Sequence, residues 1–146
     1  YKRGFLRNSI ISNPLSRGKP GYSPVVIHTE IAAGNKLKIT VLPKGFGCEN
    51  KTQLKMFNPT AKISEIERFI VDLVESAGPD ACPPYIVCVG IGGTADYAMF
   101  LAKKALLKPV IRRFGKLEAD LLRKINKLNI GPMGLGGKTT CLGVNI

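Results

Sequence analysis

The chain has 146 residues, about the length of one domain, and its 45% hydrophobic and 22% charged residues are ordinary for a globular protein. Disordered and fibrous classes are therefore excluded. No apolar stretch reaches the roughly 18 residues of a membrane span, and the first residues lack an apolar signal segment, so we expect no membrane association. The formal net charge of +12 raises the question of nucleic acid, but the basic residues are spread from Lys2 to Lys138, which favours a solvated surface.

Apolar and polar residues alternate over residues 25–31 and again over residues 37–42, with Gly34 between the two segments. This period of two predicts an N-terminal β-hairpin with one buried face. His28, the single histidine, lies in the first of these strands. A histidine in such a strand is more often structural than catalytic, although its ring could serve as a ligand or a base.

Helical periodicity predicts three amphipathic helices, and apolar patterns predict two further strands. The helices are expected over residues 64–77, 96–107 and 117–128, and the strands over residues 85–89 and 140–144. Ser64 and Glu67 have the spacing of a capping box at the first helix start. The continuous apolar run indicates that the first of these strands is buried on both faces. We therefore expect an α/β fold of mixed α+β type, with helices packed on a mixed sheet.

The residue most suggestive of chemistry is Cys82, which lies between the first helix and the following strand and is followed by Pro83 and Pro84. Two prolines stiffen the backbone and give the thiol a fixed direction, as a metal ligand requires. On local features alone, a buried free cysteine in a turn is the more common case. The four cysteines are too sparse for a disulfide scaffold, which favours a reducing cytoplasm.

Two glycine-rich segments nearly match known phosphate-binding motifs. Residues 90–95 fit the alanine-ended dinucleotide pattern between a strand and a helix, yet no acidic residue follows about 20 residues later. Gly137-Lys138-Thr139 lacks the first glycine of a P-loop and precedes a predicted strand instead of a helix. The turn at residues 90–94 therefore supports one alternative, a non-catalytic anion- or nucleotide-binding module.

Six ordered segments together resemble one enzyme family. They are LRNS at 6–9, KGFGCENK at 44–51, ACPP at 81–84, VGIGGT at 89–94, AKKALL at 102–107 and IGPMGLGG at 130–137. In this order they resemble the α subunit, or N-terminal domain, of the iron–sulfur class I fumarases and L(+)-tartrate dehydratases. The match extends over nearly the whole chain, which makes it far more specific than a single glycine pattern. The resemblance therefore favours a metal-ligand role for Cys82 over the buried free cysteine that its local features suggest.

The resemblance implies a hydro-lyase that adds water to a dicarboxylate such as fumarate, or dehydrates L-tartrate, with a [4Fe-4S] cluster as Lewis acid. It assigns Cys82 as the middle cluster ligand, Arg7 as a substrate-carboxylate arginine, and Gly47 as a backbone contributor to the substrate pocket. An arginine suits bidentate carboxylate binding, and glycine amides suit a dianion. A β subunit or C-terminal domain would carry the catalytic base, in a higher oligomer.

The resemblance also indicates that residues 1–146 are the internal portion of a single longer domain. The other two cluster cysteines of the family lie before the LRNS segment and after the final strand, so this sequence contains one of three ligands. Cys48 stands where the family commonly has serine, and Cys141 where it commonly has alanine. We therefore expect both to be small residues in packed positions and not replacement ligands. Cys88, within the predicted strand, is expected to pack in the core.

Overall fold

The computed structural model describes Leu15, residues 26–110 and residues 115–146. It divides the chain into two compact units, residues 1–41 and residues 42–146, which we describe separately. The expectation that the whole chain forms one domain therefore stays a prediction. Every helix and strand described below belongs to the second unit.

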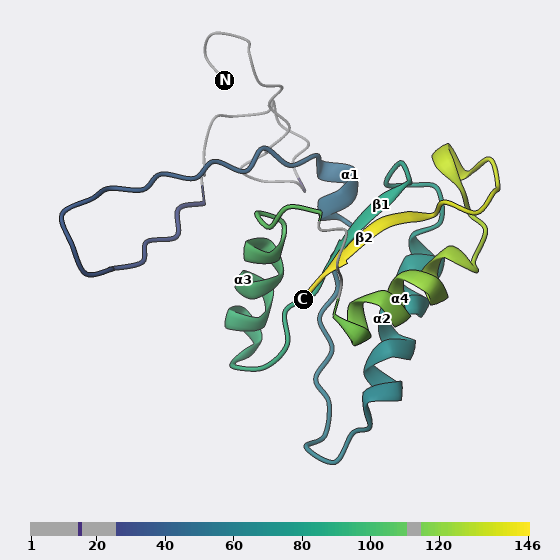
Figure 1. Cartoon of the computed structure of the whole chain (residues 1–146), viewed down its shortest axis with the longest axis horizontal. Helices are drawn as coiled ribbons and strands as arrows, with labels where there is room; N and C mark the ends of the chain where they lie inside the picture. Colours follow the sequence, from purple (N-terminus) through teal and green to yellow (C-terminus); the bar gives the residue numbers. More distant parts are fainter. Residues whose placement is uncertain (1–14, 16–25, 111–114) are drawn as a thin grey trace, which may run out of the picture. The chain divides into compact units, whose positions relative to one another are not determined.

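In the first unit, the predicted hairpin is wrong over the described residues 26–41, which contain no strand and run as an open loop (Figure 1). The apolar side chains that would form its buried face are exposed, with Ile31 at 100% and Leu37 at 86% relative exposure. Alternation of apolar and polar residues creates an apolar face, but a two-stranded hairpin gains little stability unless another layer covers that face. In the described structure these side chains stay exposed, so the pattern does not produce a ladder.

The second unit contains four α-helices, one 3-10 turn and two strands over its described residues. In chain order these are α1 (Phe46–Glu49), α2 (Ile63–Ala77), β1 (Tyr85–Cys88), α3 (Ala95–Ala105), α4 (Lys116–Asn126), the 3-10 turn Pro132–Gly134 and β2 (Cys141–Asn145). The α/β class is confirmed. The sheet expected to be mixed is, in this part of the chain, a parallel pair in which Val87 lies beside Val144.

The helices α2 and α4 lie on one side of the two strands and α3 lies on the other (Figure 1). The core forms where α2, α4 and β2 meet. Its most deeply buried members are Val74, Leu121, Ile125 and Val144, each at most 2% exposed. Burial of such a side chain contributes about 1.5–3 kcal/mol, so this cluster is the main stabilising feature of the unit.

The α2 start differs from the predicted capping box. The helix begins at Ile63 after the N-cap Lys62, whose N–H donates to Glu65 Oε1 at 3.1 Å. Glu67 is instead 9% exposed and accepts a hydrogen bond from Lys124 Nζ of α4 at 2.7 Å. Glu67, which had the spacing of a capping residue, therefore joins α2 to α4, because a buried carboxylate needs a charged partner.

The strand β1 is less buried than its apolar sequence predicts, since Ile86 is 44% exposed in the described structure. Asn145 of β2 is 3% exposed, and its side-chain amide donates to the Ala105 and Lys108 carbonyls at 3.2 and 3.4 Å. These bonds satisfy carbonyl groups at the C-terminal end of α3 and fasten that helix to the sheet.

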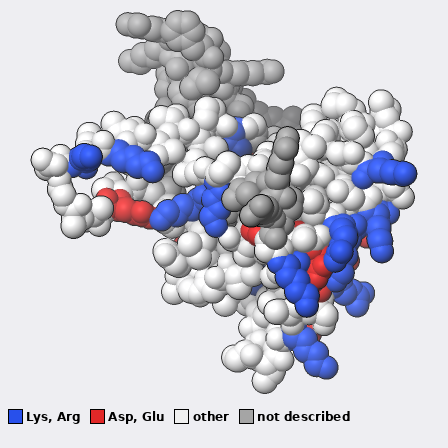
Figure 2. All heavy atoms as spheres, in the orientation of Figure 1, with Lys and Arg blue, Asp and Glu red and all other residues white. Residues whose placement is uncertain are grey.

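The surface of the second unit carries both signs of charge. Figure 2 shows acidic atoms between the basic groups on the side where α4 lies. There the Arg123 guanidinium pairs with Asp120, and Lys124 pairs with Glu67. This interspersion agrees with the expected solvated surface. No helix among the described residues has the length and apolarity to cross a membrane.

Candidate functional site: the Cys82 turn

The Cys82 turn, residues 79–84, follows α2 and leads into β1. Cys82 N–H donates to the Pro79 carbonyl at 3.0 Å, and the residue has a left-handed backbone with φ 57°. Ala81 on one side is 7% exposed and Pro83 on the other is fully buried, whereas Cys82 itself is exposed. Buried neighbours thus hold the turn against the core and present the thiol to solvent.

The left-handed conformation of Cys82 is unfavourable for a residue with a Cβ, by about 1–2 kcal/mol relative to the usual helical region. Glycine, and to a lesser degree asparagine, are the residues that normally occupy such positions. A cysteine here is therefore not explained by backbone preference. Strain of this kind is characteristic of residues whose side chain has a function.

The loop at residues 44–51 packs directly against this turn through the short helix α1. Cys48 Sγ donates to the Ala81 carbonyl at 3.6 Å, and Lys51 Nζ pairs with Asp80 Oδ2 at 2.6 Å. A Cβ built on Gly47 would lie 3.6 Å from the Asp80 carbonyl oxygen, an ordinary van der Waals distance. Two residues assigned to the site from sequence, Gly47 and Cys82, therefore lie on neighbouring segments.

Glu49 of α1 joins this region to α3. Its carboxylate accepts a hydrogen bond from Lys103 and pairs with Lys44 Nζ at 2.9 Å. Partial burial opposes ionisation, but the hydrogen bonds and charges of Lys103 and Lys44 outweigh it and hold the pKa of Glu49 below its usual value. Glu49 is therefore a fixed negative charge that binds two cationic side chains.

The glycine-rich segment at residues 130–137 packs on the other side of the Cys82 turn. Met133 N–H donates to the Pro83 carbonyl at 2.8 Å. Gly131 and Gly134 have φ of 70° and 75°, and a Cβ at Gly134 would collide with the Pro79 side chain. These glycines are required by backbone conformation and close packing. They show how a segment distant in sequence is fitted against the turn.

Four of the six segments singled out from sequence are thus connected by direct contacts: 44–51, 81–84, 102–107 and 130–137. Arg7 lies outside the described residues. His28 is exposed. Among the described residues, no three His, Cys, Asp or Glu side chains are grouped so that they could hold a metal ion.

The turn at residues 90–94 lies at the opposite end of β1 from Cys82, so the two are not brought together. Gly90 allows α3 to pack closely on the chain, because a Cβ there would overlap the Ala98 carbonyl oxygen. At the helix start, the Asp96 carboxylate accepts hydrogen bonds from the Thr94 hydroxyl and from the amides of Asp96 and Tyr97, which lower its pKa. The chain's own carboxylate therefore uses the donors that an external anion would need.

The four cysteines fall into two classes. Cys48 and Cys82 are exposed, so the expectation of a packed position for Cys48 is wrong. Cys141 is 2% exposed, and burial raises its pKa. Burial and the neighbouring Cys141 raise the pKa of Cys88 to about 11. Only Cys48 and Cys82 are exposed to solvent, and both lie at or beside the Cys82 turn.

Sequence reasoning missed the contacts of Cys48, Lys51 and Asp80, and the structural role of Asn126. Asn126 Oδ1 accepts from the Thr140 and Cys141 amides, both at 2.8 Å, and so fixes the end of α4 to the start of β2. No local pattern marks such contacts, because they join residues far apart in sequence.

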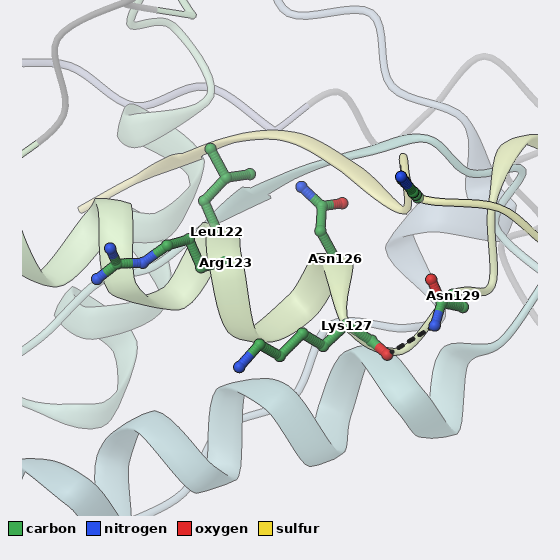
Figure 3. Close-up of a pocket in the computed structure, with 6 residues that line it drawn as sticks. Leu122, Arg123, Asn126, Lys127 and Asn129 are labelled. Carbon is green, nitrogen blue, oxygen red and sulfur yellow. Dashed lines mark hydrogen bonds between the residues drawn. The ribbon is translucent and has the colours of Figure 1, made fainter.

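A hollow of about 490 Å³ lies beside the α4 end (Figure 3). Its lining is mainly basic and amide side chains, namely Leu122, Arg123, Asn126, Lys127, Asn129 and Lys138. None of these residues belongs to the Cys82 turn or to α1, and Asn126 already bonds the backbone of β2. We therefore place the candidate site at the Cys82 turn and not in this hollow.

Comparison with known proteins identifies the class to which this fold and turn belong. The model of the family described as fumarate hydratase (fumerase) matches residues 1–146. The chain therefore belongs to the fumarate hydratase family.

Particular relatives are named as tartrate dehydratases. A Methanocaldococcus jannaschii protein, provisionally named L(+)-tartrate dehydratase subunit alpha, is 45% identical over 130 residues, 85% of this chain and 46% of the relative. The L(+)-tartrate dehydratase subunit alpha of Escherichia coli K12 is 31% identical over 128 residues, 84% of this chain and 42% of the relative. The chain thus spans less than half the length of these relatives.

Proposed function

We propose that this chain is part of a hydro-lyase that reversibly adds water to a dicarboxylate such as fumarate, or dehydrates L-tartrate. Membership of the fumarate hydratase family supports the reaction class, and the names of the relatives support tartrate as a candidate substrate. The chain would contribute one cysteine ligand of a [4Fe-4S] cluster and part of the dicarboxylate pocket. The intact protein would act in the cytoplasm.

The observation that carries the ligand assignment is the conformation of Cys82. An exposed cysteine is held at φ 57° between two buried residues, where glycine would be less strained. A thiolate is the donor that iron–sulfur clusters require, and the fixed turn suits a ligand that must not move. The residues present therefore fit one ligand of the cluster, and the remaining ligands would come from outside residues 1–146.

The cluster, when bound, would supply a Lewis-acidic iron for the hydroxyl and a carboxylate of the substrate. The chain's own residues would bind and orient that substrate. Gly47 is exposed beside the Cys82 turn, and its missing side chain lets a carboxylate approach the backbone closely. Arg7 would bind a second carboxylate in a bidentate manner.

The catalytic base would come from a β subunit or C-terminal domain. The names of the relatives, each a subunit alpha, support a partner subunit. In this proposal the partner closes the pocket over the Cys82 turn, and the assembly is a higher oligomer. Proton removal next to a carboxylate would then occur between the two components.

The test uses the full-length protein, reconstituted anaerobically with iron and sulfide together with its partner. Cys82→Ser and Cys82→Gly are both expected to lose the cluster absorbance, the bound iron and the hydratase or dehydratase activity. Glycine suits the left-handed backbone, so Cys82→Gly should fold with a stability within about 1 kcal/mol of the wild type. Its loss of iron would therefore not reflect misfolding.

The matched control is Cys141→Ala, which removes a buried thiol on β2 and should keep a full complement of iron. Activity toward fumarate, malate and L-tartrate then identifies the substrate. A normal cluster in Cys82→Gly would exclude Cys82 as a ligand. A full cluster with no activity toward any hydroxy-dicarboxylate would exclude the reaction class.

A further inference from the structure

Two exposed thiols, Cys48 and Cys82, come from segments more than 30 residues apart and lie beside one another. Cys48 Sγ contacts the carbonyl oxygen of Ala81, at 3.6 Å, and Ala81 directly precedes Cys82. Standard peptide geometry places the Cys82 Cα about 3 Å from that oxygen. The sulfur of Cys48 is therefore within about 7 Å of the Cys82 Cα, so the two cysteines lie in the same local neighbourhood.

The segments that carry these thiols are held together by a second contact. Lys51, two residues beyond the end of α1, pairs with Asp80 at 2.6 Å, and Asp80 lies two residues before Cys82. The pair fixes the helix against the turn independently of the cysteines. The two segments that carry the thiols are therefore already in contact before any bond forms between the sulfurs.

The other two cysteines provide an internal contrast. Cys141 is 2% exposed and Cys88 is partly buried with a pKa of about 11, so neither offers an accessible thiolate at neutral pH. A soluble oxidant therefore reaches Cys48 and Cys82 first. Of the four cysteines in this chain, only Cys48 and Cys82 are exposed.

We propose that Cys48 and Cys82 form a reversible disulfide when no cluster occupies the site. The proposal rests on the ligand role of Cys82, since a bound cluster would hold that thiol. A peroxide oxidises one thiol to a sulfenic acid and is reduced to water. The second thiol then attacks the sulfenic sulfur, the S–S bond forms, and the hydroxyl leaves as water with the thiol proton. The two thiols supply both electrons.

The consequence is protection of the ligand. A sulfenic acid without a nearby thiol is oxidised further to sulfinic acid, which is not readily reversed. The disulfide stops this sequence, and a dithiol reductant returns both thiols by exchange. Cys48 would then be a resolving thiol for Cys82.

The experiment uses full-length protein from which iron and sulfide have been removed by chelation. The protein is treated with stoichiometric hydrogen peroxide, alkylated, digested without reductant and analysed by mass spectrometry. The expected product is a peptide pair joined through Cys48 and Cys82, two hydrogens lighter than the reduced peptides and absent after dithiothreitol. Protein with an intact cluster should give much less of it.

Cys48→Ser, which keeps a small polar side chain but removes the thiol, should lose this product completely and accumulate sulfinic acid at Cys82. Cys141→Ala should form it as the wild type does. Separate sulfinic acids at Cys48 and Cys82 in the wild type, or a cross-link from Cys82 to a cysteine outside residues 1–146, would overturn the proposal. Failure of the cross-link leaves iron binding by Cys82 unaffected, so it is distinguishable from failure of the ligand assignment.

Discussion

Gly47 is a glycine that the fold does not require. Its φ lies outside the left-handed region, and a Cβ there would meet only the Asp80 carbonyl oxygen at 3.6 Å. Gly90 is different, because a Cβ at that position would overlap the Ala98 carbonyl and lie 2.7 Å from the Ala102 nitrogen. Packing therefore explains Gly90 but does not explain Gly47, for which we propose a role in ligand approach.

We predict that Gly47→Ala leaves folding intact and weakens substrate binding. Alanine in the short helix should change the free energy of unfolding by less than about 1 kcal/mol, and in the stabilising direction. The added methyl group would keep a substrate carboxylate from the backbone, so KM for the dicarboxylate should rise severalfold. Thermal unfolding and steady-state kinetics of the full-length enzyme measure both effects.

Gly90→Ala is the matched comparison. Its methyl group has no space between β1 and α3, so the variant should lose about 1–3 kcal/mol of stability. An unchanged KM in Gly47→Ala would contradict the assignment of Gly47 to the substrate pocket. A large loss of stability in Gly47→Ala would show that its role is structural.

At the scale of elements, the association of α1 with the Cys82 turn is the contact that organises the site. The Lys51–Asp80 pair is partly exposed, with the lysine side chain at 31% and the aspartate at 64%. Exposed pairs contribute only about 0.2–1 kcal/mol to stability. The Lys51–Asp80 pair would therefore position the Cys82 turn and would contribute little to the stability of the fold.

We predict that Lys51→Met loosens the Cys82 turn without unfolding the protein. The free energy of unfolding should fall by no more than about 1 kcal/mol. Iron release from the reconstituted protein into a chelator should become severalfold faster, because the ligand would be held less rigidly. Arg68→Met, which removes the exposed α2 pair with Asp72, is the control and should leave the release rate unchanged. Equal rates in both variants would contradict a positioning role.

The helices and strands of the second unit could be predicted from periodicity, but the contacts that build the site could not. The inward residues of α2 and α4, such as Val74 and Leu121, recur at helical spacing, and this pattern is intrinsic to the sequence. The short helix α1 was missed, because its four residues include two small ones and none is buried. A helix of one turn is fixed by its neighbours and leaves no periodic signal.

The failures have a common physical cause, which is tertiary context. Glu67 had the spacing of a capping residue, yet its buried carboxylate pairs with Lys124 on another helix. Residues 26–41 had the alternation of a hairpin, yet their apolar side chains, such as Ile31 and Leu37, are exposed. For the site, Cys82 was singled out from its prolines and motif order, whereas its left-handed backbone and exposed neighbour Cys48 required coordinates.

On the scale of the whole molecule, a few acidic side chains join elements within a chain that carries a large excess of positive charge. The chain has 22 basic and 10 acidic residues, and acidic groups join separate segments at Glu49, Glu67 and Asp80. Protonation of these groups would break contacts between elements and also raise the net charge above +12. Both effects oppose the compact state.

We predict that acidification removes the stabilising contribution of Glu49. Its pKa is lowered in the folded protein from the ordinary value of 4.5, so the contribution is fully present above about pH 4.5 and is lost as the pH falls through the folded pKa. Glu49→Gln should therefore be less stable than the wild type at pH 7. The difference in thermal midpoint should shrink as the pH falls below about 4.5 and through the lowered pKa of Glu49.

The control is Asp72→Asn, which alters an exposed carboxylate on α2 that joins no second element. Its thermal midpoint should stay close to that of the wild type at pH 7. Added salt screens the mutual repulsion of the basic residues, so it should recover part of the wild-type stability at low pH. A midpoint difference for Glu49→Gln that stays constant from pH 7 down to the pH of acid unfolding would mean that the carboxylate charge does not bind α1 to Lys44 and Lys103. The lower thermal midpoint of Glu49→Gln would then arise from altered packing alone.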